Sequence, residues 1–190
     1  LFWITNPAYF FNMQSFRYTQ DTIDAELKKS KEDFILHFRS AYTDDYPPAW
    51  MIAEILPLGL LCRIYTNLKD NVIKKRVAQH FGLQVPVFSS WIVILAGLRN
   101  MCCHHCRTWN RELATITTEP RRTKYGWIDS SRTDKRRMYY RICMIRYFLY
   151  TVSPNNSFKD KLKTLLAAYP NIDTAAMGFP SDWESEDIWK

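Results

Sequence analysis

Apolar side chains recur at three- and four-residue intervals along most of the chain, the spacing that places them on one face of an α-helix. No segment alternates apolar and polar residues with period two, as a half-buried strand would. The sequence therefore predicts an all-α fold. The expected helices cover residues 6–16, 30–42, 49–68, 71–81, 86–110, 134–152 and 156–169.

Helix-breaking residues predict where these helices bend and end. Pro57 predicts a kink in the helix 49–68, and Gly82 predicts a helix C-terminus. The segment 115–133 is rich in Thr, Arg, Ser and Pro, which is typical of a long loop. In the helix 134–152, five residues are expected to face the core. They are Tyr139, Ile142, Ile145, Leu149 and Val152.

The length of 190 residues suits one domain, or one domain with an appendage. Residues 1–30 are expected to form an N-terminal helical segment, the end of a truncated N-terminal region, because the chain opens at Leu1 inside an apolar stretch. Residues 31–190 are expected to form the main helical domain. A hydrophobic content of 47% excludes a disordered chain. The scarcity of glycine, at five residues, favours helices over a barrel or sandwich.

Positive charge is concentrated in one stretch of a chain whose net charge is +7. Between Arg107 and Arg146 there are eleven Lys or Arg against four acids, whereas the last ten residues are acidic. Such a basic stretch indicates a polyanionic partner, nucleic acid first. Charge alone is equally compatible with a solvated surface.

Cysteine usage and hydropathy indicate a compartment. Five cysteines without framework spacing argue against a disulfide-stapled secreted domain, and no signal peptide is visible. The longest apolar run, 91–98, is shorter than the roughly 20 residues that cross a membrane. The sequence therefore predicts a cytoplasmic protein without a membrane partner.

The segment 99–107 carries the densest chemistry, because two of the four histidines lie side by side there after an arginine. On a regular helix Asn100 and His104 share one stripe, while Arg99 lies about 140° around from His104. Arg99 and His104 converge only if the long arginine reaches around, the helix deforms, or a second chain contributes. The last possibility predicts a dimer.

These residue types suit cleavage of a phosphodiester. A histidine can take a proton from a ribose 2′-hydroxyl or give one to the leaving oxygen, and a guanidinium can stabilise charge on the phosphoryl oxygens. A purely structural role of partly exposed histidines at a helix end also fits the spacing. A zinc site built from Cys102, Cys103, Cys106 and the two histidines is a third interpretation. Without a second ligand pair, the cysteines are expected to pack as small hydrophobic side chains.

Blocks across nearly the whole chain resemble the Abi family of abortive-infection proteins (the AbiD and AbiF group). They run in the family's order from about Phe34 to Trp189, and the family's N-terminal portion has no counterpart among them. The blocks are Tyr46 to Glu54, Tyr65 to Lys69, Phe81 to Leu83, Ser90-Trp91, Leu98 to Asn100, His104 to Arg111 and Met177 to Trp183.

Proteins of this family are similar to HEPN-domain ribonucleases, whose motif is an Arg, a polar residue and a His after four intervening positions. Arg99, Asn100 and His104 fit it, and His105 fits the longer spacing. The resemblance implies a HEPN-like helical bundle with extra C-terminal helices. It implies bacterial phage defence by RNA cleavage without a metal or cofactor, leaving a 2′,3′-cyclic phosphate at a site between two HEPN units. It also implies RNA partners: the substrate, and a structured small-RNA antitoxin.

Further residues are assigned supporting roles. Glu54, an acid on an apolar helix, is expected to anchor Arg99 or a histidine, or to pair with another arginine. Tyr125 and Trp127 either stack on bases or cover the core. Trp50, Trp91 and Trp109 are expected in the core. The residues expected to contact RNA are Arg107, Arg111, Arg121, Arg122, Lys124, Arg132, Lys135, Arg136 and Arg137.

Two other functions remain open from the sequence. A non-catalytic RNA-binding module would use the same basic stretch and keep the Arg-His motif for binding or folding. A protein-interaction domain would use the aromatic surface to hold another defence component, and its RNA affinity would depend little on salt.

Overall fold

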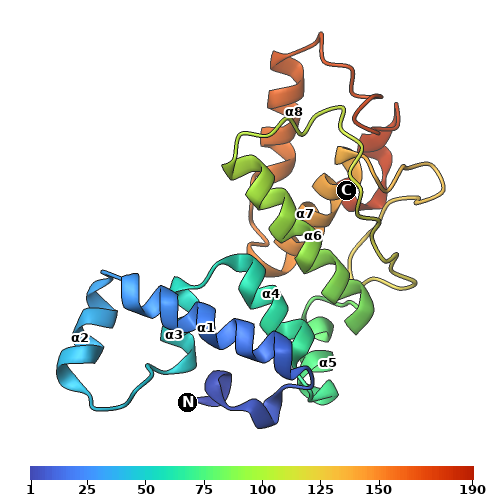
Figure 1. Cartoon of the computed structure of the whole chain (residues 1–190). Helices are drawn as coiled ribbons and strands as arrows, with labels where there is room; N and C mark the ends of the chain where they lie inside the picture. The colour runs from blue at the N-terminus through green and yellow to red at the C-terminus, as the bar shows by residue number, and fades with distance from the viewer. The chain divides into compact units, whose positions relative to one another are not determined.

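The computed structural model describes residues 1–190 and contains eight α-helices, four short 3-10 helices and no strand (Figure 1). The predicted all-α class is confirmed. The chain divides into two compact units, Leu1–Lys74 and Lys75–Lys190. The boundary predicted at residue 30 falls inside the first unit.

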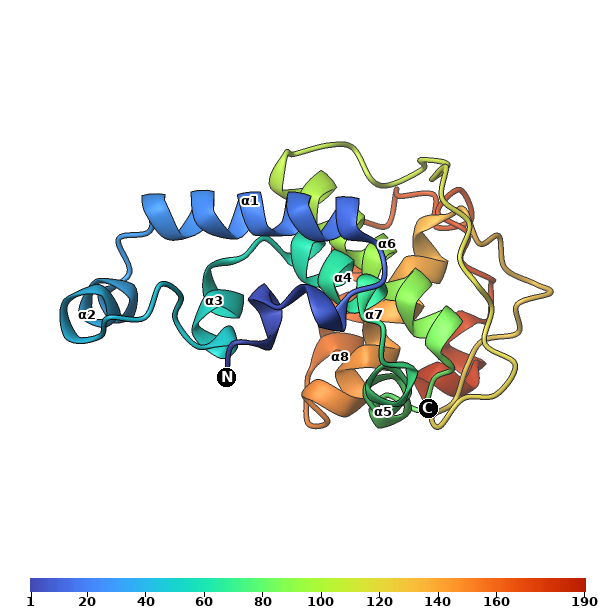
Figure 2. The same cartoon turned by 60° about the horizontal axis from the view of Figure 1, so that its bottom comes forward.

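Helix α1, Met13–Lys29, organises the first unit by lying along α3, Ala49–Ile55, and α4, Leu58–Asn67 (Figure 2). Helix α2, Asp33–Ala41, buries Ile35 and Phe38. The apolar residues at helical spacing meet in one core, as expected for helices with one apolar face. The buried members of this core are Ile4, Phe10, Phe16, Ile23, Ala49, Ile52, Leu56, Leu60 and Ile64.

Asn12 determines where α1 begins, six residues after the predicted start at Asn6. Its side-chain oxygen accepts the N–H of Ser15 at 2.8 Å, which caps the helix. The buried Asn67 accepts the N–H of Asn12 at 2.9 Å and donates to its carbonyl at 3.1 Å. This pair of hydrogen bonds joins the start of α1 to the end of α4. Pro7–Tyr9 forms only a 3-10 turn.

The helix predicted over 49–68 is broken rather than kinked. Leu56 (ψ 143°) and Pro57 (ψ 138°) are both extended, so α3 ends at Ile55 and α4 begins at Leu58. Proline has no backbone N–H to donate, and its ring disfavours a helical conformation in the residue before it. The consequence is two short helices in place of one.

Gly82 ends α5, Asn71–His80, and confirms the predicted stop. Its φ of +66° lies in the region that favours glycine, and the next residue, Leu83, donates its N–H to the carbonyl of Ala78 at 3.0 Å. A Cβ atom at this position would overlap the Cβ of Lys124. The turn therefore needs glycine for its conformation and for the close approach of the loop.

Trp91 lies at the centre of the second unit, in which α6, Val85–Cys103, and α7, Met138–Val152, lie side by side (Figure 1). Its side chain is fully buried, with ring centroids 4.7 Å from Trp127 and 5.5 Å from Tyr147. Its indole N–H donates to the carbonyl of Thr118 at 3.0 Å. The long loop between the two helices is thus packed on the core. Helix α8, Phe158–Ala168, completes the unit.

The face of α7 that is buried differs from the predicted one. Of the five residues expected in the core only Tyr139 is buried; Ile142, Ile145 and Leu149 are half-buried, and Val152 is exposed. Apolar residues surround this helix, so their spacing does not single out one face. The side chains that are fully enclosed are Tyr139, Tyr140, Cys143, Met144 and Tyr147.

Trp189 anchors the C-terminal segment. Its side chain is fully buried, and its indole N–H donates to the hydroxyl of Tyr139 at 3.0 Å. Trp183 packs edge-on against it at 5.0 Å, and Phe179 packs on Tyr139 at 4.6 Å. These ring contacts hold the last residues against α7.

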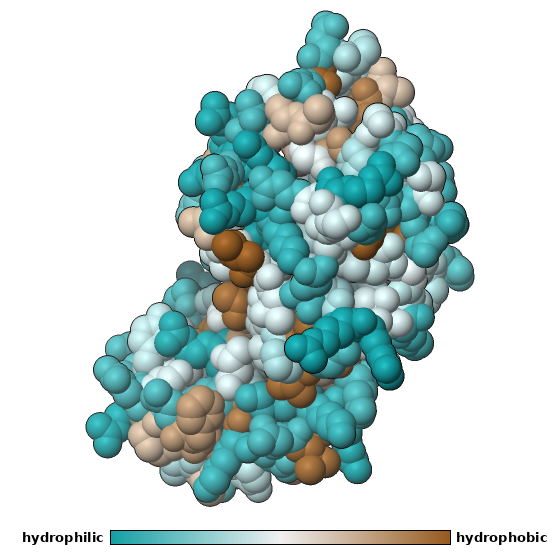
Figure 3. Space-filling model, turned by 90° about the vertical axis from the view of Figure 1, so that its right-hand side faces the viewer, coloured by the Kyte–Doolittle hydropathy of each residue, from teal (hydrophilic) through white to brown (hydrophobic).

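Two tryptophans that were expected in the core lie at the surface. Trp50 is 65% exposed and Trp109 is 44% exposed, so this expectation is wrong for both. On the face drawn in Figure 3, apolar patches are small and separated by hydrophilic side chains. Scattered apolar residues of this kind are normal on a folded surface.

Helix α6 is the one helix in the chain that is long and apolar enough to cross a membrane, judged by length and composition. It spans 19 residues with a mean hydropathy of 1.4, and it extends beyond the uninterrupted apolar run 91–98 at both ends. The core helix of a soluble protein meets the same criterion. Here α6 contributes Trp91, Ile94 and Leu98 to the buried core of its unit.

We expect Gly82→Ala to lower the free energy of unfolding by about 2 kcal/mol or more, because alanine is strained at positive φ and would overlap Lys124. Gly59→Ala is the control, since a Cβ there meets nothing within 4 Å in a helical turn. Urea unfolding followed by circular dichroism gives both values. Equal stabilities of the two variants would contradict the role assigned to Gly82.

Candidate functional site

The C-terminal end of α6 presents the predicted motif. The helix ends at Cys103, earlier than the predicted residue 110, and the chain turns through His105 at φ 52°. Cys106 donates its N–H to the carbonyl of Met101 at 2.9 Å, and His105 donates to Cys102 at 3.0 Å. This is the Schellman pattern of helix termination, with histidine in the position that glycine usually takes. Histidine tolerates the left-handed region better than most residues, and an outlier there motivates a functional hypothesis.

The motif side chains are accessible to solvent. Arg99, Asn100, His104 and His105 are all exposed, and none of them makes an ion pair. Arg99 donates to the side-chain oxygen of Asn100 at 3.4 Å, a long hydrogen bond. The imidazole nitrogens of both histidines are therefore accessible to a bound ligand, and the Arg99 guanidinium keeps N–H donors that bond to no protein group.

No hydrogen bond or ion pair joins Arg99 to His104. The helix is regular through Cys103, and the N–H of His104 still donates to the carbonyl of Asn100 at 3.0 Å. The deformation that would bring the two side chains together is absent, so Arg99 stays about 140° around the helix from His104. Asn100 and His104 lie on one stripe, as the spacing predicts.

Four of the predicted RNA-contacting cations are held by acids. Lys135 pairs with Glu119, Arg136 pairs with Glu112 at 2.6 Å, and Arg137 lies 3.6 Å from Asp134. The hydrogen bond from Lys135 holds the pKa of Glu119 below its usual value. These ion pairs neutralise much of the charge that makes the stretch look basic in the sequence.

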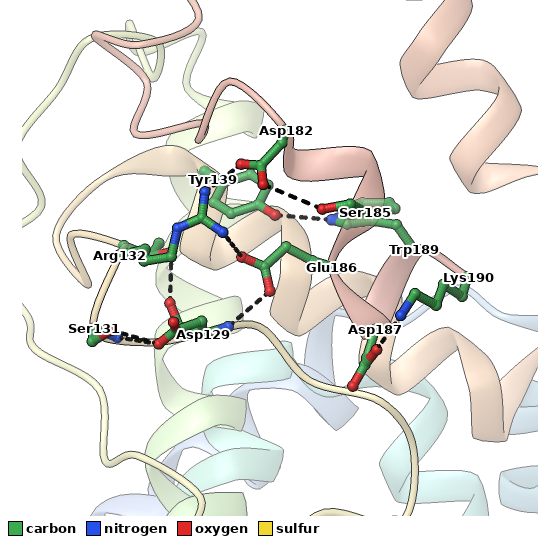
Figure 4. A network of polar contacts seen from close by, with 11 residues as sticks. Asp129, Ser131, Arg132, Tyr139, Asp182, Ser185, Glu186, Asp187, Trp189 and Lys190 are labelled. Atoms are coloured by element: carbon green, nitrogen blue, oxygen red, sulfur yellow. Dashed lines mark hydrogen bonds and ion pairs between the residues drawn. The ribbon is translucent and has the colours of Figure 1, made fainter.

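The fourth paired cation, Arg132, belongs to a network that joins the loop to the C-terminal segment (Figure 4). It bonds to Asp182 and lies 3.8 Å from the buried Glu186, which also accepts the N–H of Asp129 at 2.9 Å. The hydrogen bond from Arg132 lowers the pKa of Asp182. Arg132 therefore serves the fold and is engaged before any ligand arrives.

Five predicted cations have no acidic partner in the structure. Arg107 lies just after the motif, and Lys124 packs over the ring of Tyr125 at 5.0 Å. All five are exposed and remain available to a polyanion. They are Arg107, Arg111, Arg121, Arg122 and Lys124.

Two aromatic residues of the loop cover the core. Trp127 packs on Trp91, and Tyr125 stacks on Tyr150 at 5.1 Å. The sequence left two roles open for these rings, stacking on bases and covering the core. In the structure both rings pack on the core. Glu54 is exposed on α3 in the first unit and makes no ion pair, and its supporting role stays a prediction.

The three cysteines around the histidine pair are exposed, so the expectation that they pack as hydrophobic side chains is wrong. Cys62 and Cys143 are the buried ones. No group of three or more His, Cys, Asp and Glu side chains is placed so that it could hold a metal ion.

Arg141 is a residue that the sequence analysis missed. It lies on α7 and is only 1% exposed, and burial lowers the pKa of its guanidinium. Its partners are the carbonyl of Thr115 and the sulfur of Met144, and it makes no ion pair. The only sequence signal is an arginine inside a run of aromatic and apolar residues, which does not distinguish a buried arginine from an exposed one.

Comparison with known proteins finds one family. A family model described as Abi-like protein matches residues 1–110. The match includes the motif and residues 1–33, and it stops before the block Met177 to Trp183. Searches of curated proteins and of solved structures find no match to the chain.

Acid should release the C-terminal segment. The pKa of Asp182 is lowered from its ordinary 3.8, so its stabilising contribution is present above that value and is lost as the pH falls through the lowered one. We expect the indole N–H of Trp189 to exchange faster near the lower end of this range, as measured by NMR. Asp182→Asn should exchange faster already at pH 7. Identical exchange in both proteins at pH 7 would refute the anchoring role.

Proposed function

The chain belongs to the Abi-like family of abortive-infection proteins, and we propose that it is a metal-independent endoribonuclease of bacterial phage defence that acts in the cytoplasm. The observation that carries the proposal is the exposed end of α6. There an arginine, an asparagine and two histidines stand together without an acidic partner, directly before Arg107. This set of groups suits acid–base chemistry on a phosphodiester.

His104 is the proposed acid–base group. It takes the proton of a ribose 2′-hydroxyl, whose oxygen attacks the adjacent phosphorus, and the bond from phosphorus to the 5′-oxygen of the next nucleotide breaks. A second histidine, His105, gives a proton to that leaving oxygen. The products are a 2′,3′-cyclic phosphate and a 5′-hydroxyl. Histidine suits both steps because its pKa lies near neutrality.

Arg99 is the proposed phosphate stabiliser, because a guanidinium can donate two parallel hydrogen bonds to phosphoryl oxygens. Within one chain its backbone position lies about 140° around the helix from His104. We therefore place the active site between two copies, so that the Arg99 of one copy faces the His104 of the other. A two-fold dimer of this kind holds two equivalent composite sites. Asn100, next to Arg99 and on the stripe of His104, orients the histidine or the phosphate.

The cations without acidic partners are the proposed RNA contacts. They serve the substrate strand, and a structured small-RNA antitoxin would use the same charges. Because exposed ion pairs are weak, RNA can still compete for Arg132, Lys135, Arg136 and Arg137, but each contact would first have to break an existing pair. The contribution of these four should therefore be smaller.

A non-catalytic RNA-binding module is the second candidate. The separation of Arg99 from both histidines within one chain favours it if the protein does not form dimers. The same unpaired cations would then bind RNA, and the motif would contact phosphates without cleaving them. Cleavage by the native chain separates the two functions.

We expect His104→Ala to reduce cleavage of single-stranded RNA in EDTA about 100-fold or more, the usual contribution of an acid–base group. His80→Ala is the control, an exposed histidine on α5 outside the motif. Gel analysis of the products and their cyclic-phosphate ends gives the readout. Equal cleavage by both variants would remove His104 from the mechanism. No cleavage by the native chain, with salt-dependent binding, would favour the binding module.

Mixing two inactive variants tests the composite site. Arg99→Ala and His104→Ala chains that exchange subunits should regain about one quarter of the native rate, because about half of the dimers are mixed and each has one intact site of two. Unmixed samples at the same concentration are the control. A site within a single chain predicts no recovery on mixing.

A further inference from the structure

A pocket of about 380 Å³ lies beside α6 in the second unit. Its walls come from Val93, Gly97 and Met101 of α6, from residues 111–115 of the loop that follows α6, and from Arg141 of α7. Most of the lining is apolar, and two arginines are among the polar groups. A concave apolar site with a few polar groups, of a volume within about 300–1,000 Å³, is typical of a small-ligand site.

The buried arginine of this pocket lacks a counter-charge. Arg141 is 1% exposed and forms no ion pair, and its Nε has no hydrogen-bond partner. Its other nitrogens contact the Thr115 carbonyl and the Met144 sulfur. Glu112, the one acid in the pocket wall, is bonded to Arg136 at 2.6 Å. A buried charge of this kind is costly unless an anion pairs with it.

Arg146 shows the contrast on the same helix. Its two terminal nitrogens donate to the side chains of Asn156 at 3.2 Å and Tyr150 at 3.1 Å, and its guanidinium lies 4.3 Å from the Tyr150 ring centroid. It does not line the pocket. Both arginines leave Nε without a hydrogen-bond partner, but Arg146 gains a ring contact and two side-chain oxygens, whereas Arg141 has one carbonyl, one sulfur and a pocket beside it.

The pocket opens on the side of α6 that carries His104, opposite to Arg99. At about 100° per residue, Met101 lies about 60° from His104 and about 160° from Arg99. Gly97 provides the opening, because a Cβ there meets nothing within 4 Å. A ligand in the pocket would thus lie on the side of the helix that carries His104.

We propose that this pocket binds the phosphate group of one nucleotide unit, with Arg141 and Arg111 holding the phosphate oxygens and the apolar wall contacting the ribose and base. Guanidinium groups are the preferred partners of phosphate. The nucleotide is either a unit of an RNA strand that runs to the end of α6 or a free mononucleotide. The identification as a nucleotide rests on the proposed function, whereas anion binding rests on the pocket alone.

Calorimetric titration of the whole chain tests the proposal with three ligands: inorganic phosphate, adenosine 5′-monophosphate, and a short 2′-O-methyl RNA that cannot be cleaved by 2′-hydroxyl attack. Gly97→Leu should fill the pocket, and Arg141→Met should remove its charge. Each should weaken binding about tenfold or more. Arg141→Met loses a charged hydrogen bond, and Gly97→Leu excludes the ligand by its volume. Gly59→Leu and Arg146→Met are the matched controls, outside the pocket, and should bind normally.

Each outcome decides the proposal. Loss of RNA binding in both pocket variants assigns the pocket to an RNA phosphate, and loss of mononucleotide binding alone assigns it to a free nucleotide. Binding of inorganic phosphate without either nucleotide ligand overturns the nucleotide assignment. Unchanged binding of all three ligands in folded Gly97→Leu overturns the pocket, even if Arg141→Met fails to fold. Because no step requires cleavage, the pocket can stand if the ribonuclease proposal fails, and the reverse also holds.

Discussion

The burial of Trp91 is the interaction on which the second unit depends. A buried indole needs a hydrogen-bond acceptor, and the loop provides it through the carbonyl of Thr118. The same loop places Trp127 against the indole, and α7 places Tyr147 there. Helix α6 is thereby held by both neighbours, so its C-terminal end presents an exposed motif from a rigid element. A site on a helix is positioned more precisely than one on a loop.

Ion pairs determine which cations of the loop between α6 and α7 remain free to bind a polyanion. Exposed pairs such as Arg136–Glu112 add little stability, because water and salt screen the attraction between their charges. Their effect is to orient the chain between α6 and α7, which lacks regular secondary structure to do so. The acidic C-terminal segment takes part through Asp182 and Glu186. The basic stretch is therefore a mixed surface, with its unpaired cations nearest in sequence to the motif and in the segment 121–124.

The two buried arginines of α7 show how one helix can serve stability and binding at once. The Nε of each lacks a hydrogen-bond partner, but the terminal nitrogens of Arg146 bond to side chains and its guanidinium packs on the Tyr150 ring, whereas Arg141 lies beside a pocket. A group that is incompletely satisfied in the free protein lowers stability and favours a ligand that completes its contacts.

The sequence by itself determined the helical class and the stop at Gly82, because periodicity and backbone stereochemistry are local. It did not determine which face of α7 is buried, since that helix is apolar on nearly every side. Nor could it separate paired from unpaired cations, because Arg132 and Asp182 lie 50 positions apart. Only the tertiary structure brings such residues together, and burial and electrostatic pairing depend on neighbours in space.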